Sequence, residues 1–111
     1  MIRRLFIIVS LLVLGTASYA SNGESFAIRR GVNLSHWLSQ MVENCPAIKD
    51  GMHEIDFRKI ARDGFDHVRL PIDEEVMWNE QGQKNEEAFH FLHQGIRWAM
   101  QNDLRVIVDL H

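Results

Sequence analysis

Residues 66–72 read Asp-His-Val-Arg-Leu-Pro-Ile, and residues 105–110 read Arg-Val-Ile-Val-Asp-Leu. Both are compact apolar runs of strand length, which is typical of strands that are buried on both faces of a parallel sheet. A third segment, Ala27 to Leu34, is shorter and is also compatible with a strand. The sequence therefore predicts three strands that lie far apart along the chain.

Two amphipathic helices are predicted between these strands. The first runs from Ile55 to Asp63, with acidic residues before and within its first turn and Gly64 just beyond its end. The second follows Asn85 as N-cap and ends before Asn102-Asp103, because apolar residues recur at helical spacing: Phe89, Leu92, Ile96 and Ala99. The right-handed crossover rule then places three parallel strands against two helices, an α/β arrangement.

Residues 21–111 are interpreted as one structural segment, because no repeat, charge run or Pro/Gly-rich linker divides them. A parallel sheet needs cover on both faces, and two helices on one side leave the other face bare. A lone unit of this size would be marginally stable or prone to aggregation. We therefore expect the sequence to be the beginning of a longer protein.

Composition excludes several classes of protein. The chain has 111 residues, of which 46% are hydrophobic and 24% charged, so it is neither disordered nor of low complexity. Its formal net charge of −3 gives no basic surface for nucleic acid. Its single cysteine cannot form an internal disulfide framework or a thiolate zinc site.

The N-terminus is predicted to be a secretory signal peptide that covers residues 1–20. Met1-Ile2-Arg3-Arg4 is a basic start, and residues 5–14 are apolar apart from Ser10. Ser18-Tyr19-Ala20 places small residues where signal peptidase accepts them. The alternative is an uncleaved membrane anchor, but the apolar run is shorter than the ~20 residues that a membrane-spanning helix needs. We expect cleavage after Ala20, secretion to the periplasm or the medium, and no membrane span in the mature protein.

Polar residues fall at the carboxyl ends of all three predicted strands: Asn33, Arg69 and His111. In parallel α/β folds, and above all in the eight-stranded barrel, these ends build the active site. The two-residue period of a strand puts Gly31, His67 and Asp109 on the same faces as these residues. In a barrel, that face is the interior.

These segments resemble the opening of glycoside hydrolase family 5, which includes cellulases and related secreted β-glycanases. The matching stretches occur in the family's order and spacing: Arg30 to Leu34 with Trp37-Leu38, Ile60 to Ile72, and Val106 to His111. The resemblance implies the N-terminal part of a (β/α)8 barrel, or TIM barrel. It also implies hydrolysis of β-linked glucans or mannans with retention, by glutamates at the ends of the fourth and seventh strands. Both glutamates are expected beyond His111, because no glutamate here sits in the family's Asn-Glu setting.

The resemblance also implies roles for individual residues. Arg69 matches the catalytic-site arginine that orients the nucleophilic glutamate, and His111 matches a histidine that contacts the sugar being cleaved. Asn33 is similar to the asparagine that ends the first strand and ties the floor of the site together. Trp37 could stack on a sugar face or pack in the core, and both alternatives remain open. Trp78, after the second strand, could line a sugar subsite or belong to a surface loop.

The expected protein is a secreted, cellulase-like endo-β-glucanase, monomeric when complete, that acts on β-glucan without a metal or other cofactor. The 111 residues alone are expected to be inactive. The main alternative is a truncated, non-catalytic gene product, at best a carbohydrate-binding remnant. A metal-binding protein is a third possibility, suggested by His90 and His93, although no further ligand is identifiable near them. Without the resemblance, Arg69 could simply pair with an acidic neighbour such as Asp73.

Overall fold

The structure is a computed structural model, and it describes residues 28–42 and 45–111. The predicted signal peptide, residues 1–20, lies outside the described residues. The elements follow in this order: β1 (Gly31–Asn33), the short 3-10 helix η1 (Ile48–Asp50), α1 (Glu54–Arg62), β2 (His67–Ile72), α2 (Glu74–Met77), α3 (Glu86–Gln101) and β3 (Arg105–Leu110). No helix in the described part of the chain has the length and apolar character needed to cross a membrane.

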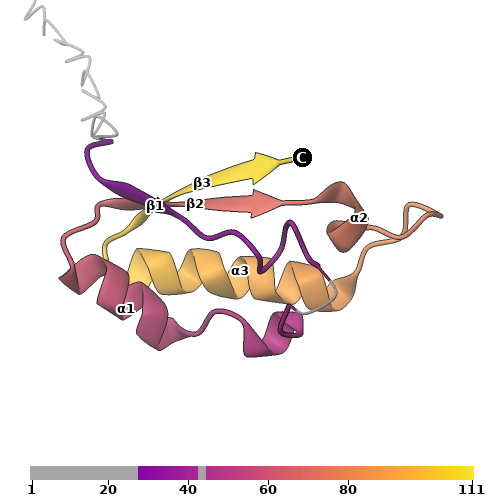
Figure 1. Cartoon of the computed structure of the whole chain (residues 1–111), viewed down its shortest axis with the longest axis horizontal. Helices are drawn as coiled ribbons and strands as arrows, with labels where there is room; N and C mark the ends of the chain where they lie inside the picture. Colours follow the sequence, from indigo (N-terminus) through magenta and orange to yellow (C-terminus); the bar gives the residue numbers. More distant parts are fainter. Residues whose placement is uncertain (1–27, 43–44) are drawn as a thin grey trace, which may run out of the picture.

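The three strands form one parallel sheet in the order β1-β2-β3, as predicted. Figure 1 shows the sheet as one layer, with α1 and α3 both on the same side of it. Because all strands point in the same direction, their carboxyl ends meet at one edge, where α2 follows β2 (Figure 1). Arg69 lies level with Asn33 on β1 and with Ile107 on β3.

Capping residues set where the two long helices begin. The Asp56 carboxylate accepts the backbone N–H of His53 at 2.8 Å, immediately before α1. The Asn85 side chain accepts the backbone N–H of Ala88 at 3.3 Å and so caps α3, as predicted. The helices begin and end within about one residue of their predicted bounds.

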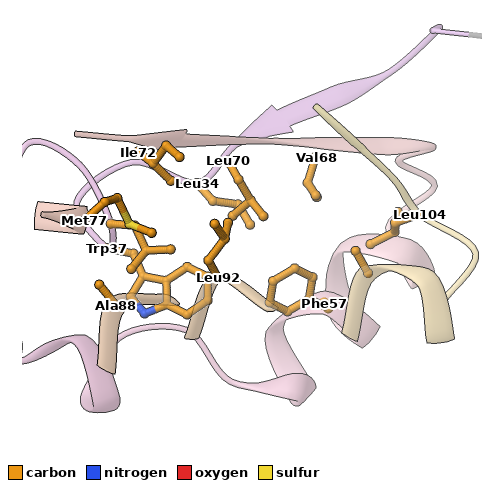
Figure 2. Packing of buried hydrophobic residues seen from close by; sticks show 12 residues of the cluster. Leu34, Trp37, Phe57, Val68, Leu70, Ile72, Met77, Ala88, Leu92 and Leu104 are labelled. Atoms are coloured by element: carbon orange, nitrogen blue, oxygen red, sulfur yellow. The ribbon is translucent and has the colours of Figure 1, made fainter. Parts of the chain in front are cut away.

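The hydrophobic core lies between the sheet and the helices. The side chains of Val68, Leu70 and Ile72 point from β2 into this layer, where Trp37, Phe57 and Leu92 also lie (Figure 2). Alternation along β2 therefore sends His67 and Arg69 to the opposite face of the sheet. The face that the helices leave uncovered is thus the face that carries the polar residues of the strands.

Trp37 anchors the segment after β1 within this core. Its side chain is only 2% exposed, and its Nε1–H donates to the carbonyl of Ile48 at 2.8 Å. A Cβ atom on Gly51 would lie 2.4 Å from the nearest atom of the indole ring, and a Cβ atom on Gly95 would lie 2.9 Å from it. Both positions therefore need glycine, because any side chain there would occupy the space of the ring.

A separate set of contacts ties β1 to β2 at the amino-terminal end of the sheet. The Asp66 carboxylate accepts the backbone N–H groups of Arg29 and Arg30 at 3.1 and 3.2 Å. It also lies 2.5 Å from Nδ1 of His67, and this contact lowers the pKa of Asp66. The His67 ring fills the space beside Gly31, where a Cβ would lie 2.1 Å from its Nε2 atom. These contacts set how closely the first two strands approach each other.

Two short elements were not predicted: η1 and α2. Neither is long enough to show a helical repeat of apolar residues, which is the pattern that predicts a helix. α2 is the more relevant of the two, because it follows β2 directly at the edge where the polar strand ends meet.

Candidate active site

Four side chains form a hydrogen-bonded cluster at the carboxyl ends of the strands: Asn33, Arg69, Asp109 and His111. Arg69 is at its centre. Its Nη1 donates to Oδ1 of Asn33 at 2.6 Å, and its Nε donates to Oδ2 of Asp109 at 3.0 Å. The Nη2 group donates to the same Asp109 oxygen. The structure thus brings together all three polar residues that were predicted at strand ends.

Asp109 is the carboxylate that holds the Arg69 guanidinium. The sequence placed Asp109 on the same strand face as His111, but it did not identify Asp109 as the partner of Arg69. Hydrogen bonds from Arg69 lower the pKa of Asp109 below its ordinary value. Arg69 thus does pair with an acidic neighbour, but that neighbour is Asp109, which lies diagonally across from it on the same face of the sheet, and not Asp73.

His111 continues the pairing of β2 and β3 beyond the last residue of β3. Its backbone N–H donates to the carbonyl of Ile72 at 2.9 Å, and its carbonyl accepts from the N–H of Glu74 at 3.1 Å. Its Nε2 atom lies 2.9 Å from Nη2 of Arg69 and 3.3 Å from Oδ2 of Asp109. The imidazole is therefore held by its backbone and by Arg69.

An open cleft of about 1090 Å³ lies beside His111, lined by residues from the end of β2, α2 and the following loop: Asp73, Glu74, Glu75, Trp78, Asn79, Glu80, Gly82, Leu110 and His111. Trp78 is half-buried, and the edge of its ring packs against Phe89 with the ring centres 5.2 Å apart. Pairing between Trp78 and Lys84 closes this loop into a small antiparallel turn. Trp78 therefore lies on the cleft wall in a supported loop.

Trp37 does not belong to this site, so the structure corrects the prediction that it stacks on sugar. The indole ring lies among core side chains that include Met77, Ala88 and Leu92 (Figure 2). Of the two alternatives that the sequence left open, core packing describes this residue. The physical reason is that the chain after Leu34 turns toward the helix layer, where Gly51 and Gly95 leave room for the ring.

Two Asn-Glu dipeptides occur in the described residues, but neither lies at the end of a strand. Asn79-Glu80 is in the loop between α2 and α3, and Asn85-Glu86 is at the start of α3. The described residues also hold no group of three or more histidine, cysteine, aspartate or glutamate side chains placed to bind a metal ion. His90 packs edge-on against Phe91, with the ring centres 5.2 Å apart.

Comparison with known proteins gives consistent matches. A family profile described as cellulase (glycosyl hydrolase family 5) matches residues 19–111. The chain is 33% identical over 88 residues to cellodextrinase A of Ruminococcus flavefaciens, and 30% identical over 88 residues to endoglucanase C of Acetivibrio thermocellus. These matches cover 79% and 77% of this chain, but 26% of the length of each relative.

Among solved structures, a trimodular GH5_4 subfamily endoglucanase superposes with a TM-score of 0.64 at 25% identity. That match covers 76% of this chain and 16% of the endoglucanase. The three parallel strands and their helices therefore correspond to part of a (β/α)8 barrel, as the resemblance implied.

Proposed function

The chain belongs to the cellulases of glycosyl hydrolase family 5, and we propose that it forms part of the active-site edge of a secreted enzyme that hydrolyses β-linked glucan. Because the chain spans 26% of the length of its curated relatives, the remaining strands of the barrel are proposed to come from residues outside these 111. The matching relatives are a cellodextrinase and an endoglucanase, which favours a β-glucan as substrate.

The arrangement around Arg69 is the observation that carries this proposal. A guanidinium has five N–H groups. In the described residues, four of them have acceptors: Nε and Nη2 donate to Asp109, Nη2 lies against His111, and Nη1 donates to Asn33. One N–H of Nη1 is left to donate to a carboxylate that another strand of the barrel would bring to the same edge. Several hydrogen bonds thus hold the Arg69 guanidinium, and one N–H of its Nη1 group has no acceptor among the described residues.

We propose that this donor orients the nucleophilic glutamate. Retaining hydrolysis needs a carboxylic acid that protonates the leaving oxygen and a carboxylate that attacks the anomeric carbon, held about 5 Å apart. A guanidinium hydrogen-bonded to the second carboxylate would lower its pKa and keep it ionised. Asn33 and His111 would complete the floor of the site, with His111 in contact with the sugar, and Trp78 would bind sugar on the cleft wall.

The test uses the intact gene product that carries this sequence. Release of reducing ends is measured with cellulose, mixed-linkage glucan, xyloglucan and mannan, for the parent and for Arg69→Ala and Arg69→Lys. Arg58→Ala is the matched control, because Arg58 is an exposed arginine on α1 that pairs with Glu54. We expect Arg69→Ala to lower kcat far more than it raises KM, because the arginine acts on the nucleophile. We expect Arg58→Ala to leave both constants unchanged.

Two results would contradict the proposal. A rise in KM with an unchanged kcat would assign Arg69 to substrate binding alone. An intact protein that releases no sugar from any of these substrates would favour the non-catalytic alternative. Retardation of that protein in gels that contain each polysaccharide would then identify a carbohydrate-binding remnant.

We also propose that residues 1–20 direct export and are removed. The mass of the protein recovered from the periplasm or medium decides this, since cleavage after Ala20 leaves Ser21 as the first residue. A recovered protein that retains Met1 would contradict the proposed cleavage.

A further inference from the structure

We propose that Asp73 is a positioning residue that links the loop after β1 to His111 and determines which nitrogen of the His111 ring carries the proton. The link between the loop and His111, and the position of the ring proton, do not depend on any enzymatic activity. Its consequence for turnover rests on the proposed function.

Asp73 follows β2 directly and holds the loop after β1 through two hydrogen bonds. Its backbone N–H donates to the carbonyl of Leu38 at 2.9 Å. Its Oδ2 atom accepts the backbone N–H of Gln40 at 2.6 Å. Gln40 has a φ of 53°, in the left-handed region that residues other than glycine rarely adopt. The carboxylate therefore helps to hold this loop in a conformation that Gln40 would not otherwise favour.

The other carboxylate oxygen faces His111. Oδ1 of Asp73 lies 3.7 Å from Nδ1 of His111, just beyond hydrogen-bond length, and the Asp73 side chain is only 18% exposed. The charged groups that approach the His111 ring are thus Asp73 after β2, Arg69 on β2 and Asp109 on β3. Asp73 faces Nδ1, whereas Arg69 and Asp109 face Nε2.

Contacts at the two ring nitrogens favour one of the two neutral forms of the His111 ring. Nε2 of His111 lies 2.9 Å from Nη2 of Arg69, and a guanidinium nitrogen can only donate. Oδ2 of Asp109 lies 3.3 Å from the same Nε2 and can only accept, but this contact is longer and that oxygen already accepts from Arg69. The shorter contact with Arg69 favours an accepting Nε2 and a ring proton on Nδ1, where it faces the Asp73 carboxylate. A negative charge at this position stabilises the Nδ1–H form. Asp73 thereby supports the Arg69 contact from the far side of the imidazole.

Asp73→Asn separates the two functions of the carboxylate. The remaining amide oxygen can still accept the N–H of Gln40, so the loop keeps its anchor. The amide NH2 group then faces Nδ1 of His111 and favours a lone pair there, which moves the proton to Nε2. An Nε2–H would oppose the N–H of Arg69 and would donate to Oδ2 of Asp109 instead, so the contact between His111 and Arg69 would be lost.

The experiment is nitrogen-15 NMR of the histidine rings in the intact protein, with the His111 signals assigned by their loss in His111→Gln. We expect the Nδ1–H form in the parent and in Asp73→Glu, and the Nε2–H form in Asp73→Asn. Asp56→Asn is the matched control, because the Asp56 carboxylate also accepts a backbone N–H, that of His53 at 2.8 Å. It should leave the His111 signals unchanged.

An Nε2–H form in the parent would overturn the proposal even if Asp73→Asn failed to fold. The same form in the parent and in a folded Asp73→Asn would also overturn it. If the intact protein hydrolyses glucan, we expect kcat to fall in Asp73→Asn and to be restored in Asp73→Glu, with KM little changed. If the intact protein is inactive, the proposed function fails while the NMR result still decides this proposal.

Discussion

Replacing Trp37 by alanine distinguishes a core residue from a sugar-binding residue. A buried tryptophan removes about 150–250 Å² from water, which is worth about 4–6 kcal/mol at ~25 cal/mol per Å². Alanine retains part of that burial, and buried Phe/Trp→Ala changes typically cost about 3–5 kcal/mol. Because Trp37 is 2% exposed and donates to Ile48, we expect Trp37→Ala to lower the free energy of unfolding by about 4 kcal/mol.

Trp37→Phe refines this test. Phenylalanine keeps most of the ring volume and loses the Nε1–H that donates to the carbonyl of Ile48 at 2.8 Å. The loss of this hydrogen bond should cost about 0.5–1.5 kcal/mol, because the Ile48 carbonyl still accepts the backbone N–H of Gly51 at 3.3 Å. The assay is urea unfolding of the intact protein, followed by circular dichroism and by tryptophan fluorescence. Agreement of the two probes checks that the transition is cooperative.

Trp78→Ala is the matched comparison, because Trp78 is half-buried and lies on the cleft wall. We expect it to cost less stability than Trp37→Ala and to raise KM for glucan. The reasoning would be refuted by the reverse pattern: a Trp37→Ala protein as stable as the parent, with weakened substrate binding.

Three further outcomes are expected in the intact protein. Gly31→Ala should lower the free energy of unfolding, measured in urea, by about 1–3 kcal/mol, because the new methyl group would lie 2.1 Å from His67. Adding His67→Ala to that variant should restore much of the lost stability. The hydrogen bonds from Arg69 lower the pKa of Asp109 from 3.8, so the ionised carboxylate stabilises the folded protein above pH 3.8. This stabilisation is lost as the pH falls through the lower pKa that Asp109 has in the folded protein. The difference in urea midpoint between the parent and Asp109→Asn should therefore be larger at pH 6 than at pH 3, and an equal difference at both would contradict this linkage. Asn85→Ala removes the cap of α3 and should cost about 1 kcal/mol, with faster amide hydrogen exchange in the first turn of that helix.

Residues near each other in the sequence determined the strands and the two long helices. The runs at 66–72 and 105–110 show strand-like apolar composition, and the 85–102 segment repeats its apolar residues at helical spacing, so local periodicity alone predicts these elements. The same periodicity, with the rule that parallel strands align their carboxyl ends, brought Asn33, Arg69 and His111 to one edge. These inferences need no knowledge of side-chain contacts.

Only the tertiary structure decided which side chains meet. The bond between Arg69 and Asp109 joins residues 40 positions apart, and the bond between Asp73 and Gln40 joins residues 33 apart. Strand register and loop path set such contacts, and neither has a local pattern in the sequence. Local sequence does not predict the burial of Trp37 either, because the glycines at 51 and 95 that make room for its ring are distant from it in sequence. Local periodicity thus determines which face of an element a residue occupies, whereas packing between distant segments determines the partner it finds there.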